Sequence, residues 1–225
     1  MSASPADLPI IWSVLVDGDP IRAVYEPGAA DGPVFVFAHG AGGNMNDAAV
    51  RAASGALRDR GIGVVRFNFP YAERRQKRPD PMPRLIACID SVVTLVRDEL
   101  APAPLIVGGR SMGGRAASMW TAAGGRCEGL LLLAYPLHPP GKPEQLRVDH
   151  LPDITVPVLC VNGTRDAFCT PSLMQETLDG LGANWCMKWL EGADHGFHVL
   201  KRSGRTDTGI LEEAADEIAS WVRTL

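Results

Sequence analysis

The sequence predicts an α/β protein whose sheet is mostly parallel and starts with an antiparallel hairpin. Apolar runs of strand length alternate with longer segments of helical character along the chain. After the first two runs, the strand-like segments are almost continuously apolar, which is typical of strands buried on both faces. The helical segments between them supply the crossover connections that parallel strands need. We expect all 225 residues to form one domain, 1–225, because this length suits a single domain.

The two opening strands are expected at residues 11–16 and 21–25. The intervening Asp17-Gly18-Asp19-Pro20 has the composition of a tight turn, so the two runs should form a hairpin. A short, fully apolar run at Val34–Ala38 predicts a buried strand. The helix that follows is expected over 46–60 and ends at the next glycine.

The remaining elements continue the alternation of strand and helix. Leu85, Ile89, Val92 and Val96 recur at helical spacing and predict a long amphipathic helix. Further helices are expected at residues 83–100, 112–123, 171–181 and 208–224. Further strands are expected at residues 63–69, 105–109, 129–135, 156–162 and 185–190.

One long irregular stretch, 136–155, stands out between two of these strands. It is rich in proline, and loops of this length in a compact domain are often functional. The stretch forms the whole connection between its two strands, so it leaves no room for a large cap domain over the sheet.

Composition and charge exclude several classes of function. Lys and Arg number 22 against 26 Asp and Glu, which gives a net charge of −4. Such a chain has no global basic surface for nucleic acid or an anionic membrane. No apolar run reaches the roughly 20 residues that a membrane span requires, and the N-terminus lacks the features of a secretory leader. We therefore expect a cytoplasmic protein that binds neither nucleic acid nor membranes.

The cysteines and glycines give no sign of a cofactor. The five cysteines are odd in number and none has C-x-x-C spacing, so we expect reduced thiols and no metal site. The glycine-rich His39–Gly43 lacks the Lys-Ser/Thr pair of a phosphate-binding loop. Cys169 is either a reactive thiol or a small core residue, and the second role is favoured.

The strongest motif is Gly109-Arg110-Ser111-Met112-Gly113, a G-x-S-x-G pattern between a predicted strand and a predicted helix. A sharp turn there would raise the Ser111 hydroxyl above the sheet edge, at a helix N-terminus that favours negative charge. The flanking glycines would let neighbouring chain pass close to the turn. Because a serine hydroxyl is a weak nucleophile at neutral pH, the site needs a base.

His195 and Asp166 are the predicted partners of Ser111. His195 follows the last predicted strand and Asp166 follows the strand before it. All three residues come just after the carboxyl end of a strand, where α/β sheets bind ligands. We expect His195 to act as the base and Asp166 to orient its ring. His198 and Asp194 are the alternatives for the base and the acid.

A reacting carbonyl also needs backbone N–H groups that stabilise its oxyanion. One donor is predicted at Met112, directly after the serine. The second is predicted in the loop after strand Val34–Ala38, at Ala41, with Gly42 as the alternative. His39 is expected to be structural and to form hydrogen bonds within this loop.

Gly42, Arg110 and His138 are also candidates for contacting substrate. A guanidinium can bind an anionic group, but an internal ion pair is the favoured role of Arg110 and of Arg115, one helical turn after Ser111. His138 lies in the Pro-rich stretch, where it either borders the pocket or belongs to a packed, non-catalytic loop.

These elements together resemble the α/β-hydrolase superfamily over nearly the whole chain. The segments AHGAGGNM, GGRSMGGR, YPLHPPGKPEQLR and GTRDAF are similar to those of compact α/β hydrolases related to the Tex30 and KANL3 proteins and to dienelactone hydrolases. The resemblance implies a twisted, mostly parallel sheet of about eight strands with helices on both faces. It also implies serine hydrolase activity, without a known substrate.

We therefore expect hydrolysis of a small carboxylic ester, thioester or related acyl compound through an acyl-enzyme, without a cofactor. The alternative is an interaction module that keeps the fold without useful turnover, since KANL3 proteins are components of a chromatin complex. The complete set of predicted site residues favours the enzyme. A dienelactone ring is a disfavoured substrate, because those enzymes usually carry a cysteine nucleophile. The acyl group, the leaving group and the oligomeric state are not predicted.

Overall fold

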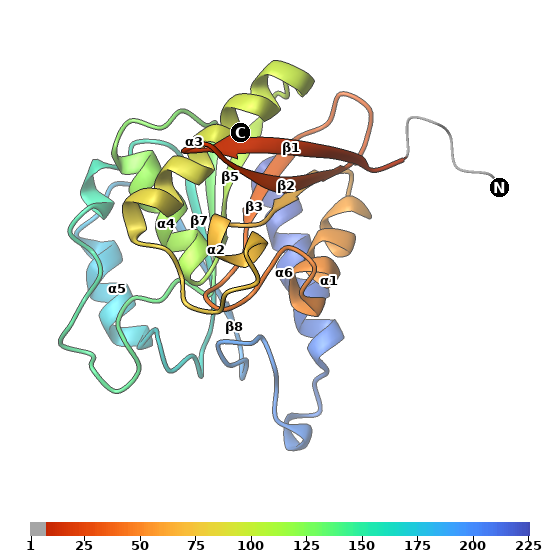
Figure 1. Cartoon of the computed structure of the whole chain (residues 1–225). Coiled ribbons are helices and arrows are strands. Elements are labelled where there is room, and N and C mark those ends of the chain that lie inside the picture. The colour runs from red at the N-terminus through yellow and green to blue at the C-terminus, as the bar shows by residue number, and fades with distance from the viewer. Residues whose placement is uncertain (1–7) are drawn as a thin grey trace.

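The computed structural model describes residues 8–225, and Figure 1 shows a central sheet with helices on both sides. The sheet has eight strands in the order β1-β2-β4-β3-β5-β6-β7-β8. Their bounds are β1 Ile10–Val16, β2 Asp19–Glu26, β3 Val34–Ala38, β4 Gly63–Phe67, β5 Leu105–Arg110, β6 Gly129–Leu133, β7 Val158–Gly163 and β8 Trp185–Leu190. The predicted fold class is confirmed.

The antiparallel part of the sheet is confined to its first strands. β1 pairs antiparallel with β2, and β2 pairs antiparallel with β4, whereas all pairs from β4 through β3 to β8 are parallel. The hairpin loop is Asp17-Gly18, two residues shorter than the predicted turn. Both loop residues have positive φ, 50° and 85°, as the tight turns that join twisted strands require.

Two layers of helices cover the two faces of the sheet. The bounds are α1 Ala48–Arg58, α2 Pro70–Glu73, α3 Met82–Leu100, α4 Met112–Ala122, α5 Pro171–Asp179 and α6 Asp207–Val222. Helices α1 and α6 pack on one face, and α3, α4 and α5 pack on the other (Figure 1). In β3, Phe35 and Phe37 face the first layer while Val34 and Val36 face the second, which explains why the strand is apolar throughout.

Three strands are shorter than predicted, each for a local reason. The strand predicted at 63–69 ends at Phe67, because Phe69 already precedes α2, a short helix with Pro70 in its first turn that the sequence analysis missed. The strand predicted at 129–135 ends before Ala134, whose φ is 50°. The strand predicted at 156–162 begins only after Pro157, which has no N–H for the ladder.

The connection between β6 and β7 carries no cap domain in the structure of residues 8–225. Its only regular element is a short 3-10 helix, Leu151–Asp153, and a second such helix, Lys201–Ser203, precedes α6. Within the same residues, no helix combines the length and the apolar character needed to cross a bilayer.

His39 joins the carboxyl ends of β3 and β4 from a fully buried position. Its Nδ1–H donates to the Gly40 carbonyl at 2.9 Å, and its Nε2 accepts from the Phe69 N–H at 3.2 Å. The structural role predicted for His39 is confirmed. Burial lowers the pKa of its imidazole below the ordinary 6.5.

The lowered pKa of His39 predicts a pH dependence of stability. The unfolded imidazole takes up a proton near pH 6.5 while the folded one does not, so the contribution of His39 is complete above that pH and is lost as the pH falls. We expect the free energy of unfolding, measured by urea denaturation, to fall from about pH 7 to about pH 5. The fall should be smaller in His39→Gln, which keeps an acceptor for Phe69. Parallel pH profiles for the two proteins would contradict this.

Glycine at 113 is required by packing, whereas Gly55 in α1 is not. A Cβ at position 113 would lie 2.4 Å from the Ala38 carbonyl oxygen, and one at position 55 would meet nothing within 4 Å. We expect Gly113→Ala to lower the free energy of unfolding by about 1–3 kcal/mol. Gly55→Ala should raise it by about 0.5–1 kcal/mol, since helical glycine is entropically unfavourable. Urea denaturation of both variants checks this, and equal effects would refute the packing argument.

Candidate active site

Ser111 lies in the sharp turn between β5 and α4, with φ 52° and ψ −118°. Positive φ is uncommon for a residue with a side chain and is often found at functional sites. The turn is held by the Ser111 N–H, which donates to the Leu133 carbonyl at 2.9 Å. Cβ atoms at Gly109 and Gly113 would both clash with the Ala38 backbone, so the two glycines of the motif allow β3 to pass close to the turn.

The His195 ring reaches Ser111 from the loop after β8. Its Nε2 lies 2.9 Å from the Ser111 Oγ, where it can accept the hydroxyl proton. The Phe168 ring packs on the imidazole with ring centroids 4.3 Å apart. The imidazole is thus held on one side by an aromatic ring, while a quarter of its side chain remains exposed to solvent.

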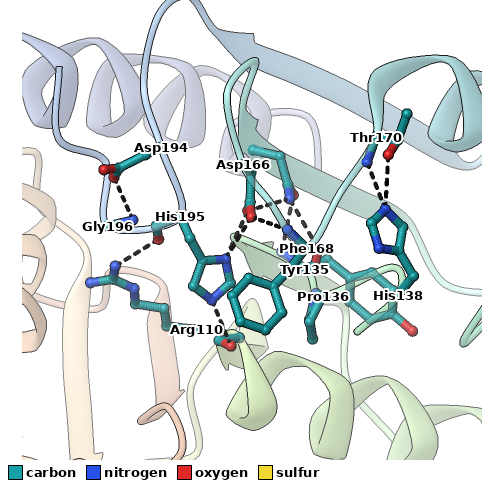
Figure 2. A network of polar contacts seen from close by, with 12 residues as sticks. Arg110, Tyr135, Pro136, His138, Asp166, Phe168, Thr170, Asp194, His195 and Gly196 are labelled. Atoms are coloured by element: carbon teal, nitrogen blue, oxygen red, sulfur yellow. Dashed lines mark hydrogen bonds and ion pairs between the residues drawn. The ribbon is translucent and has the colours of Figure 1, made fainter. Parts of the chain in front are cut away.

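Asp166 binds the opposite side of the His195 ring (Figure 2). Its two carboxylate oxygens lie 2.9 and 2.8 Å from His195 Nδ1, and its side chain is fully buried. The same carboxylate accepts from the Phe168 N–H at 2.8 Å and from the Asn162 amide at 3.3 Å. These donors fix the carboxylate, which in turn fixes the tautomer that leaves Nε2 free to accept from Ser111.

The two alternatives from the sequence have other partners. The Asp194 carboxylate turns back on its own loop and accepts from the N–H groups of Gly196 and His198. The His198 ring is exposed and pairs with Asp207 at 2.7 Å. The structure therefore brings His195 and Asp166, but neither alternative, to Ser111.

Ala41 and Met112, the two predicted oxyanion donors, line the same cavity as Ser111. Met112 is the first residue of α4, where an N–H has no partner within the helix. Neither N–H bonds to another protein group in the described part of the chain. Gly42, with φ 70°, shapes the turn but does not line the cavities at Ser111.

Two cavities meet at Ser111 and share Ala41 and Phe168 in their walls. The larger, of about 360 Å³, extends to His195 and Arg110. The smaller, of about 220 Å³, is also lined by Met112, Arg115, Pro136 and Arg147. Ser111 thus lines two cavities whose remaining walls differ.

Arg110 contacts the His195 loop instead of forming the expected ion pair. Its guanidinium donates to the His195 carbonyl at 2.8 Å and lies over the Phe197 ring, 5.6 Å from its centroid. No carboxylate of residues 8–225 is within ion-pair distance of Arg110 or of Arg115, so the sequence expectation of internal ion pairs is wrong for both. Arg110 lines the larger cavity and holds the loop that carries the base.

His138 does not border either cavity at Ser111. Its ring is buried, with Nδ1 2.9 Å from the Pro139 carbonyl and Nε2 accepting from the Thr170 N–H at 3.1 Å (Figure 2). It belongs to a packed loop, the second of the two roles considered for it. This packing joins the Pro-rich stretch to the segment after Asp166.

The sequence analysis missed Asn162 and Phe168. The Asn162 amide bonds to both backbone groups of Tyr135 and to Asp166, so it connects the ends of β6 and β7. Both residues lie in the NGTRDAF run around Asp166. This closeness in sequence to the predicted acid is the signal that could have identified them. Cys169 is a fully buried core residue, and this burial raises its pKa to about 12, which keeps the thiol protonated.

Among the residues that the structure describes, no three His, Cys, Asp or Glu side chains form a cluster that could hold a metal ion.

Known structures resemble this chain over almost its whole length. An α/β serine hydrolase without a lid from Xanthomonas campestris is 22% identical, with a TM-score of 0.76 over 100% of this chain and 97% of its own. A serine hydrolase homologue from Coxiella burnetii is 19% identical, with a TM-score of 0.74 over 96% and 97%. A dienelactone hydrolase from Anabaena variabilis is 16% identical, with a TM-score of 0.75 over 97% and 98%. These similarities show a shared fold.

A family model for an alpha/beta hydrolase domain matches residues 31–223, from just before β3 to the end of α6. The matched region includes Ser111, Asp166 and His195. Since it covers most of the chain, this protein belongs to the alpha/beta hydrolase domain family.

Proposed function

We propose that this protein is a serine hydrolase that cleaves a small carboxylic ester or thioester through an acyl-enzyme. One observation carries the proposal: the Ser111 hydroxyl, the His195 imidazole and the buried Asp166 carboxylate form a continuous hydrogen-bonded chain. This arrangement converts a weak nucleophile into an active one, because the base lies within hydrogen-bond distance of the proton it removes.

In the first step, Ser111 Oγ forms a bond to the carbonyl carbon of the substrate and His195 Nε2 takes the hydroxyl proton. The carbonyl oxygen becomes an oxyanion, which the N–H groups of Ala41 and Met112 stabilise. The bond to the leaving group then breaks, and the imidazolium gives its proton to the departing oxygen or sulfur. Asp166 stabilises the imidazolium while it exists.

In the second step, water replaces the leaving group. His195 removes a proton from the water, whose oxygen attacks the acyl carbon, and the same proton returns to Ser111 Oγ as the ester bond breaks. The products are a carboxylic acid and free enzyme, with one water consumed. The partly exposed imidazole gives water access to this site.

The size of the site supports a small substrate. The two cavities at Ser111 measure about 360 and 220 Å³. Typical small-molecule pockets span roughly 300–1,000 Å³. A lidless serine hydrolase and a dienelactone hydrolase are among the structures with this fold. The segment similarities to the Tex30 and KANL3 proteins support placing the chain, as one domain 1–225, in that compact group.

Reaction of Ser111 with an active-site probe tests the nucleophile. We expect the native protein to form one covalent adduct with a fluorophosphonate, seen by intact-mass spectrometry, because such probes react with activated serines. Ser111→Ala should form none, and Ser203→Ala, which removes an exposed hydroxyl, should react as the native protein does. An adduct that persists in Ser111→Ala would refute the assignment.

Replacement of the acid tests the orientation of the base. In Asp166→Asn the amide would donate to His195 Nδ1, so the ring would carry its proton on Nε2 and could no longer accept from Ser111. We expect kcat for p-nitrophenyl acetate to fall by about 10³–10⁴-fold. Asp194→Asn is the matched control and should lose far less, since Asn keeps the oxygen that accepts both loop N–H groups. Equal losses in the two variants would exclude Asp166 as the specific partner.

A further inference from the structure

Two arginines line the smaller cavity at Ser111. Arg115 lies one helical turn after Ser111 in α4, and Arg147 belongs to the connection between β6 and β7. The same cavity is lined by the serine and by both proposed oxyanion donors, Ala41 and Met112. Any acyl group placed there with its carbonyl at the oxyanion donors would face two positive charges.

Neither guanidinium has a carboxylate partner within residues 8–225. The Arg147 guanidinium donates only to the Pro136 carbonyl, at 3.3 Å, and the Nε of Arg115 is buried without any hydrogen-bond partner. Among residues 8–225, every other arginine that is partly or fully buried, except Arg110, pairs with an acid. These are Arg58, Arg60, Arg66, Arg84, Arg97 and Arg205. The half-buried Arg115 and Arg147 therefore lack the acid partner that most arginines of similar burial have.

The charge of Arg115 acts on the pKa values of Tyr135, Arg147 and His150. Burial raises the pKa of the Tyr135 hydroxyl, so this neighbour stays uncharged. Burial and, after it, the charge of Arg115 lower the pKa values of Arg147 and His150. Asp149 and Asp153 act in the opposite direction on the pKa of His150, but no carboxylate of residues 8–225 lies within ion-pair distance of either guanidinium. A half-buried arginine is costly to leave without such a partner.

The position of His195 decides which half of a substrate faces these charges. The base must protonate the leaving group, and His195 lines the larger cavity but not the smaller. The leaving group therefore belongs in the larger cavity, and the acyl group in the smaller one with Arg115 and Arg147.

On the basis of the proposed hydrolase function, we propose that the acyl group carries a carboxylate that Arg115 and Arg147 bind. The substrates are then half-esters or half-thioesters of short dicarboxylic acids. A planar carboxylate suits paired guanidinium donors, and the small volume limits the acyl group to a short chain. A neutral acyl group of the same length would leave both guanidiniums without an anionic partner.

Kinetics on two substrates of equal size test this proposal. Monoethyl glutarate carries the carboxylate, and ethyl 5-amino-5-oxopentanoate replaces it with a neutral amide. We expect kcat/KM of the native protein, followed as acid release, to favour the charged ester by about tenfold to a hundredfold. Arg115→Gln and Arg147→Gln should bring the ratio close to one, and Arg115→Lys should restore part of it.

Arg223→Gln, which removes an exposed arginine at the end of α6, is the matched control and should keep the native ratio. Ser111-dependent hydrolysis of both esters at equal kcat/KM would overturn the carboxylate proposal while the hydrolase function stands.

Binding to an inactive protein separates the two proposals. We expect calorimetry to show that Ser111→Ala binds monoethyl glutarate at least tenfold more tightly than the amide, and that adding Arg147→Gln removes the difference. Preference for the charged ester without hydrolysis or probe labelling of the native protein would support the carboxylate site and refute the hydrolase. Equal binding of the two compounds would refute the carboxylate site.

Discussion

The hydrogen bond between the Ser111 hydroxyl and His195 Nε2 depends on where three strands end. β5, β7 and β8 run parallel and finish at the same edge of the sheet, so the loops that follow them carry the hydroxyl, the carboxylate and the imidazole to one place. The contact spans 84 positions of sequence, and only the sheet register makes it short. A slip of one residue in the pairing of a strand with its neighbour would turn that strand's side chains to the opposite face of the sheet. It would also move Ser111, Asp166 and His195 apart.

The fold and the meeting of Ser111, Asp166 and His195 were predictable because they follow from local patterns. Apolar runs gave the strands, and a G-x-S-x-G motif between strand and helix indicated Ser111. His195 and Asp166 followed from their places after strands. The ends of β4, β6 and β7 were harder, because Pro157, Ala134 and the short helix α2 change the backbone where the apolar pattern continues.

The environment of the arginines could not be predicted from the chain. Whether a guanidinium finds a carboxylate depends on which loops meet around it, and the loops near Arg110 and Arg115 bring carbonyls, aromatic rings and other cations instead. Asn162 and Phe168 were not predicted, because their contacts with Asp166 and His195 also depend on tertiary packing.

The connection between β6 and β7, which lacks a cap domain, has a consequence for the proposed hydrolysis. An enzyme with a hinged cover can test a ligand by closing over it, and closure often limits turnover. The segment here is instead fixed by contacts of Tyr135, His138 and Arg147 with the backbone around it. In the proposed reaction, the charge and shape of the cavities at Ser111 would then select the ligand without a closing movement. Ligands would reach and leave the site by diffusion.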